Sequence, residues 1–257
     1  MAANDTMEVQ SLHRALNILE AVGSSENPLS LKQLTELTGL PKPTVYRLLR
    51  NLEDRNYVTC DNTGKYRLGL QILALSRWAE RDFEVKLIAR PQLVFLSELS
   101  KETVHLAILE QNRVLYVDTV ESPHALRLVT KLGSTNSVHC TALGKALLIK
   151  HRDAEILALL EQQGMERRTE YTITTPAAYL REMQLVRTKG YALDERESEL
   201  EGRCVGAPVY DHMGNVIAAI SISGLSTRFS AAHIEQNIVP HLLDRTLRIS
   251  RTLGYRG

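Results

Sequence analysis

The chain has 257 residues, which exceeds the common size of a single domain and leaves room for one small and one larger unit. Hydrophobic residues make up 44% of the sequence and charged residues 24%, so the composition excludes a disordered or fibrous protein. The formal net charge is only +1, which means that any surface for nucleic acid must be local.

The N-terminal ten residues lack the apolar core of a signal peptide, and no stretch of eighteen apolar residues follows anywhere in the chain. We therefore expect a cytoplasmic protein without a membrane segment. The odd number and wide spacing of the cysteines fit a reducing compartment, because they suggest no disulfide framework.

Three helices are predicted in the first part of the chain. Apolar residues at helical spacing indicate a helix over residues 11–23. Ser30 and Gln33 form a capping-box pattern for a short second helix that ends at Gly39, and two prolines suit the first turn of a third helix over residues 42–55. This order is typical of a helix-turn-helix. The expected buried faces comprise Leu12, Ala15, Leu16, Leu19 and Val22, then Leu31, Leu34 and Leu37, then Val45, Leu48, Leu49 and Leu52.

A two-stranded wing is predicted over residues 57–68, around a turn at residues 61–64, with Tyr66 and Leu68 facing the core. From residue 41 to 68 there are six basic and three acidic residues, a local net charge of +3. The third helix and the wing therefore predict a surface for phosphates and base edges. The candidate DNA-binding residues are Lys42, Thr44, Tyr46, Arg47 and Arg50 on the helix, and Lys65 and Arg67 on the wing.

The sequence predicts a helical linker over residues 71–84, between a domain at residues 9–70 and a second domain at residues 85–257. Leu70, Leu73, Ala74 and Trp78 keep helical spacing up to the charged stretch 80–82, which is the expected joint.

Helices and antiparallel hairpins alternate in the second domain, which predicts an α+β fold. Pro91 marks a possible kink in the first of these helices. The expected helices cover residues 84–100, 139–151, 154–162 and 177–189, and the expected strands cover residues 104–109, 114–120, 127–130, 204–210 and 216–223.

Several segments resemble IclR-type bacterial transcriptional regulators. Residues 29–49 (LSLKQLTELTGLPKPTVYRLL) and 65–69 (KYRLG) are similar to the DNA-binding domain of that family. Residues 139–148 (HCTALGKALL), 194–204 (DERESELEGRC) and 218–224 (AAISISG) are similar to its effector domain. The resemblance implies a winged helix-turn-helix domain, a helical linker and a GAF/PAS-like effector domain. It also implies homodimers or homotetramers that read double-stranded DNA operators, and no cofactor.

A site for a small acid is predicted in the second domain. Ser221 and Ser223 share one face of the last strand, and its antiparallel partner begins at Cys204. The helix after Cys140 offers backbone N–H groups that suit a carboxylate. The resemblance implies that the residues matching Ala142, Leu143, Asp194, Cys204, Ser221 and Ser223 line the effector pocket. Leu143 is larger than its counterpart in some members of the family, so we expect it to reshape the pocket. The candidate effector-binding residues are Thr141, Ala142, Leu143, Asp194, Cys204, Ser221 and Ser223.

The expected function is a sequence-specific regulator that represses a catabolic operon and responds to a keto acid, a sugar acid or an aromatic acid. One alternative is an enzyme with Cys204 or Cys140 as nucleophile and His139 or His212 as base, although no GxSxG, P-loop or GxGxxG motif occurs. A second is a zinc site formed by the same four residues. A third is a regulator whose second domain only oligomerises. The acidic run at residues 194–201 predicts a solvated loop.

Overall fold

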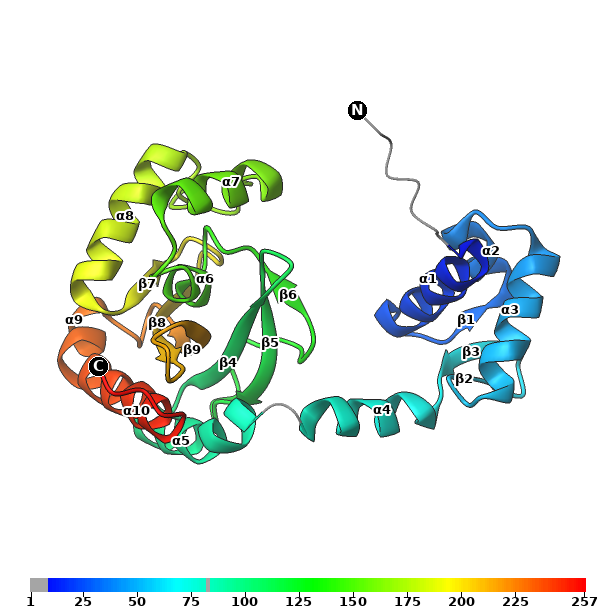
Figure 1. Ribbon diagram of the computed structural model, residues 1–257, viewed down its shortest axis with the longest axis horizontal. Helices are drawn as coiled ribbons and strands as arrows, with labels where there is room; N and C mark the ends of the chain where they lie inside the picture. Colours follow the sequence, from blue (N-terminus) through cyan, green and yellow to red (C-terminus); the bar gives the residue numbers. More distant parts are fainter. Residues whose placement is uncertain (1–8, 82–83) are drawn as a thin grey trace. The chain divides into compact units, whose positions relative to one another are not determined.

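The computed structural model describes residues 9–81 and 84–257, and the chain divides into two compact units, Met1–Asp82 and Phe83–Gly257 (Figure 1). The finer division into residues 9–70, 71–84 and 85–257 remains a prediction, and positions 82–83 of the expected linker lie outside the described residues. So do residues 1–8, where no signal peptide was expected. Within the described ranges, no helix is long and apolar enough to cross a membrane.

The first unit contains the three expected helices and the wing. The capping box at Ser30 forms as predicted: its hydroxyl accepts the N–H of Gln33, whose side chain accepts the N–H of Ser30. Gly39 ends the second helix in the left-handed conformation, with φ of 66°. The elements are α1 (Gln10–Ser24), β1 (Leu29–Ser30), α2 (Leu31–Thr38), α3 (Lys42–Asp54), β2 (Val58–Cys60) and β3 (Lys65–Leu68), with the antiparallel strand order β1-β3-β2.

The buried side of α1 differs from the expectation. Ile18 and Val22 pack in the core, whereas Leu12 and Leu16 stay exposed, because the core of this small unit covers only the second half of the helix. Leu37 and Leu68 are also exposed. Leu68 shares a strand face with buried Tyr66, but it lies at the end of β3, beyond the cover of the core.

A helix, α4 (Leu70–Arg81), follows the wing directly, so most of the expected linker is helical. Gly69 makes this junction possible, because a Cβ atom there would lie 2.1 Å from the carbonyl oxygen of Asn56. Its N–H group donates to the carbonyl of Tyr57 at 2.8 Å. The chain therefore turns from wing to helix in close contact with the end of α3.

The second unit is built on a six-stranded antiparallel sheet with the order β6-β5-β4-β9-β8-β7. Pro91 lies inside its first helix, which runs over the predicted residues. The elements are α5 (Glu84–Ser100), β4 (Thr103–Glu110), β5 (Arg113–Val120), β6 (Thr135–Asn136), α6 (Ala142–Leu147), α7 (Asp153–Gln163), α8 (Pro176–Lys189), β7 (Ala192–Glu195), β8 (Gly202–Tyr210), β9 (Val216–Leu225), α9 (Ala231–His233), the π-helix η1 (Ile234–Ile238) and α10 (Val239–Thr252).

Helices cover both faces of this sheet. α5 and α10 lie side by side against one face, and α6 with α7 and α8 covers the other (Figure 1). Alternation along β9 separates the two faces, because Ile220 and Ile222 join the core beneath α5 and α10. Ser221 and Ser223 therefore point toward α6.

Three expectations for this unit are wrong. Residues 127–130 form no strand and instead line a cavity. The helix predicted over residues 139–151 is the six-residue α6, because Thr141 caps its N-terminus and the preceding turn is held by a hydrogen bond from Tyr179 to the carbonyl of Val138. The expectation of a solvated loop at residues 194–201 is wrong for the first part of the segment, because Asp194 on β7 is 1% exposed and Glu197 is 5% exposed, whereas residues 199–201 are exposed.

Candidate functional site

The structure brings the candidate DNA-binding residues together on α3 and the adjoining wing. Lys42, Tyr46, Arg47 and Arg50 are exposed along α3, whereas Thr44 is half-buried. Arg50 pairs with Glu53 at 3.1 Å on the same helix, so its guanidinium is partly engaged already. Lys65 and Arg67 are exposed on β3, on either side of buried Tyr66.

The wing tip is fixed by its own side chains. One carboxylate oxygen of Asp61 accepts the N–H groups of Thr63 at 2.8 Å and Lys65 at 3.1 Å. Hydrogen bonds from Thr63 and Lys65 lower the pKa of Asp61. Gly64 adopts the positive φ of 77° that closes the turn. The tip is therefore a preformed turn that holds Lys65 at the start of β3.

A cavity of about 290 Å³ lies between the sheet and α6, and all seven candidate effector-binding residues line it. The sheet register explains why they converge. Ser223 lies opposite Thr103 on one side and Cys204 on the other, and Cys204 lies opposite Asp194. The remaining lining residues are His105, Tyr116, Arg127, Leu128, Val129, Thr130, Asn136, Ser198 and Glu199.

Two glycines allow α6 to close this cavity. Gly206 lies opposite Ser221 on the sheet, and a Cβ atom there would lie 2.9 Å from the backbone of Ala142. A Cβ atom on Gly144 would lie 2.3 Å from the backbone of Val138. Thr141 caps the helix by accepting the N–H of Gly144 at 3.1 Å. The first residues of α6 consequently lie directly on the polar face of the sheet.

Burial keeps several cavity groups uncharged. It lowers the pKa of His105 to about 4, and Nδ1 of this ring lies 3.1 Å from the hydroxyl of Thr119. It raises the pKa of Tyr116 to about 12 and also raises the pKa of the Cys204 thiol. These three side chains are therefore neutral hydrogen-bonding groups near pH 7.

Asp194 lines the cavity with its carboxylate already hydrogen-bonded. The N–H groups of Glu197 and Ser198 donate to Oδ1 at 2.7 and 3.3 Å, and the Ser198 hydroxyl donates to Oδ2. Burial raises the pKa of Asp194, while the hydrogen bonds from Ser198 and Glu197 oppose the shift. The carboxylate therefore shapes the turn beside the cavity and still offers lone pairs to a ligand.

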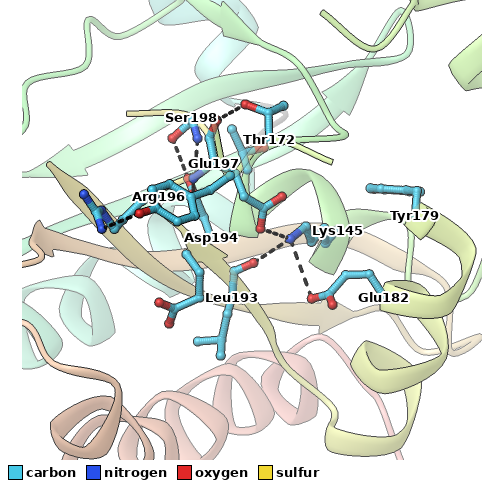
Figure 2. Close-up of polar contacts among 12 residues, drawn as sticks. Lys145, Thr172, Tyr179, Glu182, Leu193, Asp194, Arg196, Glu197 and Ser198 are labelled. Atoms are coloured by element: carbon cyan, nitrogen blue, oxygen red, sulfur yellow. Dashed lines mark hydrogen bonds and ion pairs between the residues drawn. The ribbon is translucent and has the colours of Figure 1, made fainter. Parts of the chain in front are cut away.

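Lys145 on α6 is fully buried, and Figure 2 shows the polar groups around its ammonium. The ammonium of Lys145 donates to a carboxylate oxygen of Glu197 and to the carbonyl of Leu193 at 2.8 Å, and it lies 3.6 Å from Glu182. Burial raises the pKa of Glu197, and the charge of Lys145 and its hydrogen bond oppose this shift. Neither Lys145 nor Glu197 lines the cavity.

The cysteines do not suit nucleophilic catalysis. Burial raises the pKa of Cys140 to about 12 and also raises that of Cys204, so both thiols stay protonated near pH 7, whereas the nucleophilic form is the thiolate. Among the described residues, no three His, Cys, Asp or Glu side chains gather in a way that could hold a metal ion.

Comparison with known proteins identifies the chain. The model of the IclR helix-turn-helix domain matches residues 11–62, and the model of the C-terminal domain of bacterial transcriptional regulator IclR matches residues 80–251. The chain belongs to the IclR family. It is a DNA-binding transcriptional regulator with an effector-binding C-terminal domain.

IclR-family relatives match nearly the whole chain. The Escherichia coli regulators XynR and KdgR are each 34% identical over 248 residues, which is 96% of this chain and 98% and 94% of theirs. The crystal structure of Thermotoga maritima IclR superposes with a TM-score of 0.80 at 29% identity, covering 96% of this chain and all of that one. These relatives are regulators, which supports the regulator over the enzyme alternative. The superposition confirms the predicted α+β fold class.

Sequence reasoning missed the lining residues that come from β4, β5, β6 and the segment around residues 127–130. His105 had a usable signal, because it interrupts the apolar run of a predicted strand on the face away from Val104 and Leu106. Lys145 had another, since a lysine within the apolar run of α6 is rarely left unpaired. Its partner Glu197 is 52 positions away, so only the fold reveals the pair.

Proposed function

We propose that this regulator represses a catabolic operon and is controlled by a small carboxylate that binds the cavity beneath α6. The observation that carries the proposal is the convergence of all seven candidate residues on one cavity, in the unit that matches the family's C-terminal domain. The name of a relative that is 30% identical over 228 residues, the Escherichia coli transcriptional repressor IclR, supports repression. Because the target is DNA, we place its action in the cytoplasm.

The cavity lining favours a hydroxylated acid. Arg127 is the only lysine or arginine among the described lining residues, and its guanidinium already pairs with Glu121 at 2.7 Å. The first N–H groups of α6 are further donors for a carboxylate. Asp194 and Glu199 accept hydrogen bonds from hydroxyl groups, whereas Ser221 and Ser223 can donate or accept. A sugar acid satisfies these groups best, because a simple keto acid has no hydroxyl group to donate to Asp194 or Glu199. An unsubstituted aromatic ring would offer none of these groups a hydrogen bond.

The DNA-binding part of the proposal places Arg47 against a base and Lys65 against a phosphate. Arg47→Ala should weaken binding to the chain's own promoter fragment by about 1–3 kcal/mol and relax sequence preference.

Lys65→Ala should weaken binding to all DNA sequences about equally and flatten the salt dependence of that binding. Fluorescence anisotropy at several salt concentrations measures both effects. Lys32→Ala, on exposed α2, is the control for loss of one positive charge. Full affinity in Arg47→Ala would refute the base contact.

The effector part predicts that a small acid raises the melting temperature of the full chain, because it binds the native state only. Keto acids, sugar acids and aromatic acids form the screening panel. At a concentration of 100 Kd the gain is about 2.7 kcal/mol, and Ser223→Ala should reduce it. Thr188→Ala, exposed on α8, should not. A silent panel would favour a domain that only oligomerises.

A further inference from the structure

Two separate segments form walls of the cavity. The first residues of α6, Ala142 and Leu143, form one wall, and the end of β7 with the turn after it contributes Asp194, Ser198 and Glu199 to another. We call residues 194–199 the cavity turn. These walls are far apart in the sequence, so their spacing depends on contacts between them.

The buried ion pair of Lys145 and Glu197 joins these two walls (Figure 2), although neither residue lines the cavity. Lys145 follows Leu143 by two positions on α6, and Glu197 directly precedes Ser198 in the cavity turn. The same ammonium also binds the carbonyl of Leu193 at 2.8 Å, and Leu193 directly precedes that turn on β7. One side chain of α6 therefore contacts both the cavity turn and the strand residue before it.

The cavity turn has a conformation that needs such support. Arg196 adopts a positive φ of 65°, which is costly for a residue with a side chain. Asp194 accepts the N–H groups of Glu197 and Ser198, and the Thr172 hydroxyl donates to the carbonyl of Glu197 at 2.7 Å. In this conformation Glu197 reaches Lys145 while Ser198 and Glu199 line the cavity.

We propose that Lys145 and Glu197 are positioning residues for effector binding, whose ion pair fixes the spacing of the two cavity walls without touching the ligand. Separating the two charges would leave each of them buried without its partner, which is strongly unfavourable, so the pair resists a change in the spacing of the two walls. The proposal rests on the effector cavity proposed above. It adds that affinity depends on a contact outside that cavity.

The decisive variant is Lys145→Met/Glu197→Met in the full chain, because replacing both partners by apolar residues of similar size usually preserves the fold. Hydrogen exchange followed by mass spectrometry should show at least tenfold faster exchange in peptides that cover the cavity turn. Peptides from β4 and β9 should keep their protection. Glu197→Gln, which keeps the shape and removes the charge, should show the same local effect.

The matched control is Arg187→Met/Asp153→Met. This pair joins α8 and α7 at 2.8 Å, and Arg187 also binds carbonyl groups, but neither residue lines the cavity. We expect the cavity turn to exchange at the wild-type rate in this control. Wild-type exchange of the turn in Lys145→Met/Glu197→Met, or faster exchange throughout the unit, would overturn the proposal.

The binding readout uses calorimetry with sodium gluconate, pyruvate and benzoate as probes. For any probe that binds the wild-type chain, affinity should fall at least tenfold in Lys145→Met/Glu197→Met and stay unchanged in the control. Unchanged affinity in a folded double variant would also overturn the proposal. If no probe binds the wild-type chain, the carboxylate proposal fails for these compounds, and the exchange measurement alone decides whether the pair holds the walls.

Discussion

His105 links the cavity to the pH dependence of folding. Its buried ring is neutral in the folded chain, where its pKa is about 4, whereas an unfolded histidine titrates near 6.5. Between these values the unfolded chain binds more protons than the folded chain. The stability from neutral His105 is therefore fully present above about pH 6.5 and is lost as the pH falls toward 4.

We expect His105→Gln to flatten the fall of unfolding free energy between pH 6.5 and 4, which in the wild-type chain amounts to about 2–3 kcal/mol from this group. Urea unfolding across this pH range measures the slope. His124→Gln, at an exposed position, controls for the loss of a histidine. An unchanged slope in His105→Gln would show that the ring already titrates normally in the folded chain.

At the residue scale, the sequence predicts a side chain well when its role depends on near neighbours. The alternation Ile-Ser-Ile-Ser in residues 220–223 was enough to place both serines on one polar face. Pairs such as Lys145 with Glu197 could not be predicted, because they need two segments brought together by the fold. The prediction that Leu68 faces the core is wrong for a related reason. Period-two alternation predicts which face of a strand a side chain lies on, but not where the core that covers that face ends.

At the scale of elements, the ends of a helix are predicted correctly where local side chains determine them, and incorrectly where tertiary contacts do. The capping box at Ser30 and the left-handed Gly39 fixed both ends of α2 in advance. β1 and β6, with two residues each, and β7, with four, are too short for a pattern, so their pairing comes from the neighbouring strands. α6 was predicted too long, because its ends are set by the Thr141 cap and by tertiary contacts.

The close approach of α6 to the sheet gives a prediction for Gly206. Gly206→Ala should displace the first turn of α6, because the new Cβ atom would lie 2.9 Å from the backbone of Ala142. We expect a loss of about 1–3 kcal/mol in the unfolding free energy of this unit and a changed methyl chemical shift for Ala142. Gly23→Ala, where the added atom meets only a leucine side chain at 3.4 Å, is the control. If Gly206→Ala leaves stability and the methyl signal unchanged, the contact does not set the position of α6.

At the scale of the whole molecule, the family fold accounts for the two units, but the expected assembly of copies remains a prediction. The protomer leaves an apolar stripe on α1, where Leu12 is 58% exposed and Leu16 is 46% exposed. Together with Val9, these residues recur at helical spacing on one side of the helix. An exposed apolar stripe of this kind is typical of a surface that a partner covers. The homodimer that the family resemblance implies would cover this stripe by pairing the DNA-binding units of two copies.

Leu12→Ser/Leu16→Ser should therefore weaken binding to a promoter fragment with two half-sites at least tenfold, because each unit would then bind its half-site alone. Affinity for an isolated half-site should not change. The melting temperature should also stay near the wild-type value, since both side chains are already exposed to water. Anisotropy titrations with both fragments, together with sedimentation of the 28.9 kDa chain, measure these effects. Leu185→Ser, an exposed leucine on α8, is the control. An equal loss of affinity for both fragments would instead indicate that the stripe contacts DNA or stabilises the fold of the unit. Full affinity for both fragments would show that the stripe has no role in pairing.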